Sequence, residues 1–288
     1  MVNLILGNCP GSWGVQWAGY GPFPRWDRFL DELAGAGYSW LELGPYGYLP
    51  TDPARLNDEL GRRGLRVCAG TVQGCGGLHR AGEFGDALAH TRLAAELAAA
   101  TGARDLIFMP VPGEEPPGED GWDVLVRAAN ELGKHVLGEY GLTLRFQPQP
   151  DTFVETGSQI TRFLAETDPA YVSLCLDTGH HAYAGGDPVA MITGHPDRIG
   201  YLHVKQVDAA LAIRAHRARL PYDQAVMLGA CCEPPGGLPD LRPVLDALRA
   251  RGRDAFVVVA HEPAPGHRGH AEVAARTHDY LRECGLRG

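Results

Sequence analysis

The sequence predicts a single-domain α/β protein built as a (β/α)8 barrel. Eight short apolar segments alternate with eight helix-like segments along 288 residues, which is a usual length for such a barrel. The apolar segments lack polar alternation, as expected for parallel strands that are buried on both faces. No linker divides the chain, so we expect one domain over residues 1–288.

The predicted elements follow one another in strict alternation. We expect strands at residues 4–9, 40–43, 66–71, 105–110, 143–148, 172–177, 199–204 and 255–260. We expect helices at residues 26–36, 53–63, 84–100, 122–140, 158–166, 188–195, 241–251 and 271–283. Asp52-Pro53 and Asp187-Pro188 each predict a helix start, with an N-cap followed by proline. Glycines in A-G-A-G-Y, R-R-G-L, A-T-G-A and E-Y-G-L predict helix ends.

The structural alternative is a doubly wound open sheet. Such a sheet usually carries a G-x-G-x-x-G phosphate loop after its first strand, whereas this chain has C-P-G-S-W-G-V there. A closed barrel is therefore favoured. A long loop at about residues 206–239 follows the seventh strand and contains a possible helix at residues 209–219. We expect this loop to cover the site or to reach a partner subunit, so a homodimer is plausible.

Composition and charge limit the function classes. The formal net charge of -9 argues against non-specific binding to nucleic acid or to an anionic membrane. The apolar runs fall short of the ~20 residues of a membrane span, and the N-terminal segment has no secretion signal. The seven cysteines are scattered and include no C-x-x-C pair, which indicates reduced thiols. We therefore expect a cytoplasmic protein whose partner is a small-molecule substrate.

Polar residues cluster where the predicted strands end. In a (β/α)8 barrel the carboxyl ends of the strands, and the loops after them, face one common mouth. The candidate site residues at these positions are Asn8, Ser12, Trp13, Glu42, Tyr46, Gln73, Gln147, Gln149, Asp177, His180, His203, Lys205 and Glu262.

Each candidate with an ionisable group has a structural alternative. Asp177 could bind a metal, or it could cap the turn D-T-G-H. His203 could serve the site, or it could be a satisfied core histidine. Glu42 in L-E-L could bind a substrate hydroxyl or form a structural ion pair. Lys205 lies on the same strand face as His203 and could bind a carbonyl oxygen or act as an acid, unless it is a solvated lysine at the rim.

The remaining candidates are expected to contact the substrate. His180 opens the loop after Asp177 and could reach the substrate. Trp13 and Tyr46 could form an apolar wall of the pocket, or they could simply pack the first loops. Asn8, Ser12, Gln73 and Gln149 offer polar groups at the ends of other strands.

Several segments resemble a known family. These are N-C-P-G-S-W-G-V, L-E-L-G-P-Y-G-Y-L-P, D-T-F-V-E-T, D-T-G-H-H-A-Y-A-G-G-D-P and R-I-G-Y-L-H-V-K. They are similar to the sugar phosphate isomerase/epimerase superfamily of xylose isomerase-like TIM barrels, and most of all to its inosose dehydratase branch. The resemblance implies a divalent metal in the mouth, held from strands five to eight. It also implies proton abstraction next to a carbonyl, leading to isomerisation, epimerisation or loss of water.

The resemblance carries over only in part. Asp177 and His203 match the family's aspartate and histidine on strands six and seven. The dehydratase branch has H-P-H at strand five, where this chain has Q-P-Q with Gln147 and Gln149. Ala260 replaces the glutamate of strand eight, and Glu262 could take its place. The resemblance thus implies a Mn, Mg, Co or Zn ion held by Asp177, His203, Gln147 and Glu262, or, given these losses, no metal.

Three hypotheses follow. In the first, a metal-assisted lyase or isomerase acts on a polar keto-sugar or keto-cyclitol, with Glu42, His180, His203 and Lys205 handling protons and hydroxyls. In the second, a metal-free biosynthetic enzyme performs acid/base isomerisation, cyclisation or elimination, with Asp177 and His203 as a proton-transfer pair. In the third, the chain is a non-catalytic binding protein. The retention of Asp177, His203, Lys205 and Glu42 weighs against the third.

Overall fold

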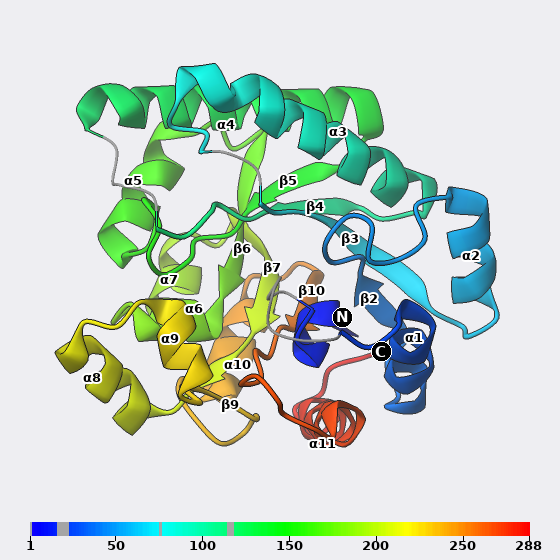
Figure 1. Cartoon of the computed structure of the whole chain (residues 1–288). Coiled ribbons are helices and arrows are strands. Elements are labelled where there is room, and N and C mark those ends of the chain that lie inside the picture. Colours follow the sequence, from blue (N-terminus) through cyan, green and yellow to red (C-terminus); the bar gives the residue numbers. More distant parts are fainter. Residues whose placement is uncertain (1, 16–22, 75–76, 114–117) are drawn as a thin grey trace.

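Eight parallel strands close into a barrel (Figure 1) within the part of the chain that the computed structural model describes, residues 2–15, 23–74, 77–113 and 118–288. The neighbours run in the order β1-β10-β7-β6-β5-β4-β3-β2, which confirms the predicted fold class. The strands are β1 (Leu4–Asn8), β2 (Trp40–Glu42), β3 (Arg66–Val72), β4 (Asp105–Phe108), β5 (Thr143–Phe146), β6 (Val172–Asp177), β7 (Ile199–Val204) and β10 (Ala255–Val259).

Helices surround this barrel, and α3 and α4 lie side by side on its outside (Figure 1). Asp52 and Asp187 cap α2 and α7 as predicted, by accepting backbone N–H groups. The described helices are α1 (Trp26–Gly35), α2 (Pro53–Gly61), α3 (Phe84–Ala100), α4 (Glu119–Tyr140), α5 (Gly157–Glu166), α6 (Thr178–Tyr183), α7 (Pro188–Gly194), α8 (Ala209–Ala218), α9 (Tyr222–Met227), α10 (Leu241–Ala250) and α11 (His270–Glu283).

Two strands end two residues earlier than the sequence pattern predicts. The strands expected at residues 105–110 and 143–148 stop at Phe108 and Phe146. Pro110 and Pro148 have no N–H to donate to a neighbouring strand, so regular pairing cannot continue through them. Gln147 therefore lies just past the end of β5, at the mouth of the barrel.

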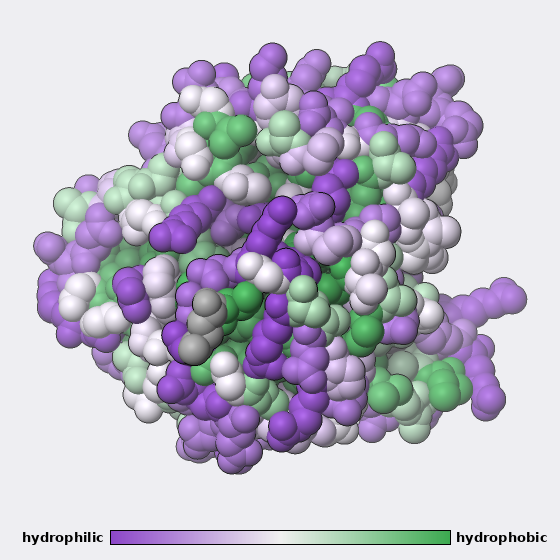
Figure 2. Space-filling model, turned by 180° about the vertical axis from the view of Figure 1, so that it is seen from behind, coloured by the Kyte–Doolittle hydropathy of each residue, from purple (hydrophilic) through white to green (hydrophobic). Residues whose placement is uncertain are grey.

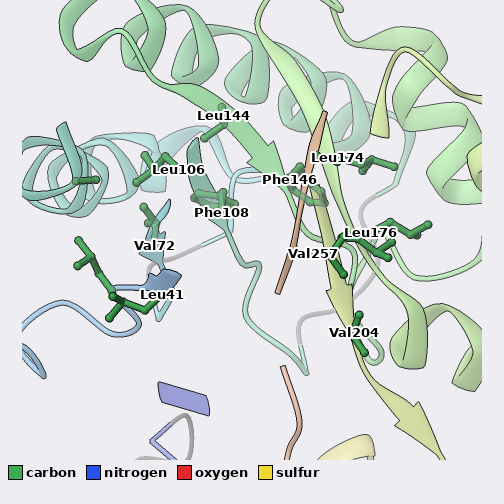
Figure 3. Close-up of a cluster of buried hydrophobic side chains, with 14 of the residues drawn as sticks. Leu41, Val72, Leu106, Phe108, Leu144, Phe146, Leu174, Leu176, Val204 and Val257 are labelled. Carbon is green, nitrogen blue, oxygen red and sulfur yellow. The ribbon is translucent and has the colours of Figure 1, made fainter. Parts of the chain in front are cut away.

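Alternate side chains of the strands face opposite sides and divide the core in two. Outward-facing residues such as Leu174, Leu176 and Val204 belong to the layer between strands and helices (Figure 3). Cys175 and Tyr201 instead belong to a separate cluster inside the barrel. The same alternation directs His203 and Lys205 inward, because they follow Tyr201 at steps of two.

The segment after β7 is an ordered insertion rather than a plain loop. β8 (Gln206–Val207) pairs antiparallel with β9 (Cys231–Cys232), and α8 and α9 lie between them at one side of the barrel (Figure 1). The helix predicted at residues 209–219 is confirmed as α8. Ala212, Ala215, Tyr222 and Val226 belong to a small apolar core of the insertion's own. The insertion can therefore hold side chains over the mouth in fixed positions.

One face of the molecule is mainly polar. Figure 2 shows one face on which hydrophilic side chains predominate and apolar ones form small patches. Across the described ranges, none of the helices has both the length and the apolar character needed to cross a bilayer. The six cysteines in these ranges are free thiols, and Cys75 lies outside them.

An ion pair lies inside the barrel at the end opposite the mouth. Arg145 on β5 donates to Asp105 on β4 over 2.6 Å, and its second nitrogen donates to the Ser173 hydroxyl on β6, also over 2.6 Å. The Asp105 side chain is 6% exposed. A buried pair of this kind tolerates the loss of one partner poorly, because the other charge is left without compensation.

We expect Asp105→Ala to lower the free energy of unfolding by about 3 kcal/mol, since it leaves the Arg145 guanidinium buried and unpaired. Urea denaturation followed by circular dichroism measures this. Asp197→Ala is the matched control, because Asp197 pairs with Arg253 at the surface and both side chains are largely exposed. Equal effects of the two substitutions would contradict the assigned importance of the internal pair.

Candidate active site

Three ionisable side chains surround the ammonium group of Lys205 at the mouth of the barrel and form a cluster of four with it. The Lys205 Nζ lies 3.0 Å from Asp177 Oδ2 and 3.1 Å from Glu262 Oε1. It also donates to His180 Nε2 over 2.6 Å. All four residues are buried, and Lys205 is only 1% exposed, so the alternative of a solvated rim lysine is wrong. The end of β6, the start of α6, the end of β7 and the loop after β10 supply the four side chains.

The charges in this cluster stabilise one another. Burial alone would lower the pKa of Lys205, but the carboxylates of Asp177 and Glu262 raise it above its usual value. Burial alone would raise the pKa of Glu262, but Lys205, His180 and the Tyr222 hydroxyl hold it well below its usual range. Burial would likewise raise the pKa of Asp177, but His180, Lys205 and His203 around its carboxylate lower it. An ammonium and two carboxylates therefore coexist at neutral pH.

A glycine makes room for the buried lysine. Gly179 follows Asp177 by two positions in the D-T-G-H turn. A Cβ atom at this position would lie 2.6 Å from Lys205 Cγ and 3.0 Å from the Lys205 carbonyl carbon. The close approach of α6 to β7 thus requires glycine here.

Asp177 fulfils both roles that the sequence leaves open. Its Oδ1 accepts from the backbone N–H of His180 over 2.9 Å and caps α6. Its Oδ2 faces the cluster, 3.6 Å from His180 Nδ1 and 3.9 Å from His203 Nδ1. Strand register places Asp177 directly beside His203. The structure therefore brings together the two residues that match the family resemblance.

Glu42 fixes the orientation of His203. The Glu42 Oε1 lies 2.6 Å from His203 Nε2 and accepts the Tyr201 hydroxyl over 2.8 Å. A carboxylate requires a donor, so Nε2 carries the proton and Nδ1 presents its lone pair toward Asp177. The Tyr201 hydroxyl also lies 3.1 Å from Cys68 Sγ, which anchors the network inside the barrel. Glu42 thus has a protein partner.

Three buried donor atoms at the mouth fit a divalent cation in their chemistry. Within the described residues, Gln147 Oε1, Asp177 Oδ2 and His203 Nδ1 have no hydrogen-bond partner. Lys205 approaches the Asp177 oxygen as an ion pair, but not with hydrogen-bond geometry. A carboxylate, an imidazole and an amide oxygen are acceptable ligands. No three His, Cys, Asp or Glu side chains of the described ranges are arranged to hold an ion, so Gln147 would have to complete the set.

A cavity of about 1170 Å³ opens above the cluster. Among the predicted site residues, Gln73, Gln149 and Glu262 line it. Glu262 is the member of the Lys205 cluster that reaches the cavity wall. His180 and Lys205 lie directly behind it, since His180 Nε2 is 3.6 Å from Glu262 Oε2. The Glu262 carboxylate pairs with Lys205, and its role as a metal ligand stays a prediction.

Four predicted contact residues lie away from the described wall of the cavity. Trp13 is buried in the core, where its Nε1 donates to Glu32 over 2.7 Å. The Ser12 hydroxyl donates to the Val259 carbonyl, and the Asn8 side chain accepts from the next backbone N–H. Tyr46 is 46% exposed and lines a separate small hollow. Their roles in substrate binding therefore remain predictions.

Tyr222 is a site residue that the sequence did not reveal. Its hydroxyl donates to Glu262 Oε2 over 2.7 Å, and its ring meets His180 edge-on with centroids 5.0 Å apart. Its backbone N–H donates to Asp151 in the loop after β5. Tyr222 begins α9, far from any strand end, so no strand pattern could point to it. Tyr201 could have been found, because it precedes His203 and Lys205 at steps of two along β7.

The chain matches a known family over most of its length. Residues 30–284 match the family model described as the xylose isomerase-like TIM barrel. The chain belongs to this family. The resemblance seen in the sequence motifs is therefore confirmed.

Individual relatives and solved structures of similar fold extend this result. The chain is 29% identical over 271 residues to an inosose dehydratase of Geobacillus thermodenitrificans, with 90% of each protein covered. Its fold is similar to that of a D-allulose 3-epimerase from Methylomonas sp., with a TM-score of 0.75, 16% identity and 98% of both chains covered. It is also similar to the IOLI protein, whose structure has a bound zinc atom, with a TM-score of 0.74, 17% identity and coverage of 97% and 96%.

We expect Lys205→Met to lower the free energy of unfolding by about 3 kcal/mol, because Asp177 and Glu262 would face each other without a cation. Adding Glu262→Gln should recover much of this loss, since one carboxylate then remains. Urea denaturation of the single and double variants measures both effects. Lys134→Met, at an exposed position of α4, is the matched control. A double variant less stable than Lys205→Met would contradict the assigned charge balance.

Proposed function

We propose that this protein is a lyase that removes water from a polyhydroxy ketone on a six-membered ring, such as a keto-cyclitol or keto-sugar. The 2.6 Å contact between Lys205 and His180 beneath the cavity carries the proposal. It joins a proton donor to a proton acceptor in a buried site, as elimination next to a carbonyl requires. The inosose dehydratase relative, covered over 90% of its length, supports this reaction class.

The cluster offers a balanced route for elimination. A carbon–hydrogen bond next to the carbonyl breaks, and its proton passes to His180 Nε2. The electron pair forms a carbon–carbon double bond as the neighbouring carbon–oxygen bond breaks. The leaving hydroxyl takes a proton from Lys205 and departs as water. His180 then returns its proton to Lys205 across 2.6 Å, which restores the site.

Other residues would position the substrate. Glu262 lines the cavity and is held ionised by Lys205, so it can accept hydrogen bonds from ring hydroxyls. Gln73 and Gln149 also line the cavity and offer neutral amide groups. The fixed Glu42–His203 pair keeps the His203 Nδ1 lone pair directed at Asp177. These side chains would hold the substrate ring in place and would not transfer protons to or from it.

Asp177, His203 and Gln147 would hold a divalent cation, if the protein uses one. When bound, the ion would polarise the substrate carbonyl. A metal-free enzyme is the second candidate, and one observation favours it. The Lys205 ammonium already places a positive charge 3.0 Å from Asp177, where it can offset negative charge on the substrate oxygen.

The reaction itself can be tested with an inosose in D2O, followed by mass spectrometry. We expect a product lighter by one water, and a rate at least about 100-fold lower for His180→Asn and for Lys205→Met. Tyr140→Phe serves as the control, because Tyr140 lies at the end of the outer helix α4 and does not line the cavity. A product that has lost no water and is heavier by one deuterium would show an isomerase or epimerase instead. A purified protein that gives neither change with an inosose or a keto-hexose contradicts the proposal.

Metal binding can be tested by elemental analysis and by titration with Mn²⁺. We expect about one equivalent of ion per chain, and at least about tenfold weaker binding for His203→Ala and for Glu42→Gln, which releases the imidazole from its fixed orientation. His135→Ala, on the outer helix α4, is the control. No binding of Mn, Mg, Co or Zn would contradict the metal-assisted mechanism and support the metal-free one.

Two expectations from the sequence complete this proposal. The free thiols agree with a reducing, cytoplasmic location. The ordered insertion after β7 offers a surface for a homodimer, which light scattering of the full chain would reveal.

A further inference from the structure

The cavity above the Lys205 cluster has two chemically different zones. The zone at the cluster is polar, with Glu262, Tyr222 and Gln149 in its wall. Apolar residues make up most of the rest of the wall, and this part is called the apolar zone below. Its described apolar wall comprises Val15, Phe23, Pro45, Tyr48, Met109, Pro110, Val111, Pro112, Leu220 and Pro221.

The apolar zone offers few partners to a polyhydroxy ring. Hydroxyl groups facing Phe23, Val111 or Leu220 would lose water without gaining a hydrogen bond, which is unfavourable. The remaining polar residues of the wall are Gln73, Asp151, His216, Arg219, Asp223 and Gln224. Of these, Asp151 and His216 already bond to Tyr222 N and to the Tyr183 carbonyl.

The size of the cavity also indicates a substrate larger than a single hydroxylated ring. Its volume of about 1170 Å³ is that of a site for a drug-sized molecule, for which the usual range is about 300–1,000 Å³. A single hydroxylated ring bound at Glu262 would leave the apolar zone empty. The wall would then contribute nothing to recognition.

We propose that the natural substrate is a polyhydroxy ring ketone that carries an apolar substituent, such as an aryl or alkyl group linked through oxygen. This inference rests on the proposed function and names its substrate class. The ring lies at Glu262 and the Lys205 cluster, and the substituent lies between Phe23 and Leu220. Phe23 is 38% exposed, so an aromatic substituent can stack on it and remove it from water.

Binding of non-reactive ring alcohols to the full chain tests the inference, with isothermal titration calorimetry as the measurement. The probes are methyl and phenyl β-D-glucopyranoside, together with the O-methyl and O-phenyl ethers of myo-inositol. Within at least one pair, the phenyl compound should bind at least about tenfold more tightly than the methyl compound. This preference should fall below about threefold in Phe23→Ser and in Leu220→Ser.

The control is Leu228→Ser, which changes a leucine of the same insertion that is 52% exposed and does not line the cavity. It should keep the full preference for phenyl compounds. Two changed residues in the wall keep the test valid if one variant fails to fold, which circular dichroism detects. Absence of a phenyl preference in both pairs, or a preference that persists in the folded wall variants, would overturn the inference.

These probes lack a ketone, so the result does not depend on catalysis. A phenyl preference together with no elimination would remove the proposed function and leave the apolar zone as a binding site. Elimination of water from an inosose without any phenyl preference would leave the proposed function in place and remove the inferred apolar substituent.

Discussion

A single buried ammonium group organises the mouth of this barrel. Lys205 lies between Asp177 and Glu262, and each of these charges would be unfavourable without the others. Their mutual stabilisation keeps both carboxylates ionised at neutral pH. It also explains Gly179, which leaves room for the lysine stem, and Tyr222, which satisfies the second oxygen of Glu262. Groups from α6, β7 and the insertion thus all contact Lys205 or one of its carboxylate partners.

The choice of lysine over arginine is itself informative. The chain has 26 Lys and Arg residues, and only Lys134 and Lys205 are lysines. A guanidinium is always protonated, so it could not transfer a proton. The compact amine suits a site that exchanges protons with His180. The acid/base chemistry proposed for this family member follows from that pairing, whether or not a divalent ion assists it.

The barrel and the insertion contribute different residues to the site. Strand alternation brings Asp177, His203 and Lys205 to the same internal side, because inward-facing positions recur every two residues. The insertion then adds Tyr222 to the cluster and Leu220 to the apolar wall. The reactive groups therefore lie on the barrel strands or directly after them, while the shape of the cavity depends on a segment with its own small core. Such an arrangement lets related barrels keep the chemistry and change the substrate.

The sequence by itself determined the barrel, its helix caps and the strand ends that carry Asp177, His203 and Lys205, because apolar periodicity and capping act over a few neighbouring residues. The sequence could not show which of these side chains contact one another. Whether Glu262 would meet a metal or Lys205, and whether Glu42 would meet substrate or His203, depends on side chains that lie far apart along the chain. Only the closed barrel brings these groups within 2.6–3.1 Å of one another, and only the folded insertion adds Tyr222. The competition between desolvation and pairing in a buried site is a property of the tertiary structure.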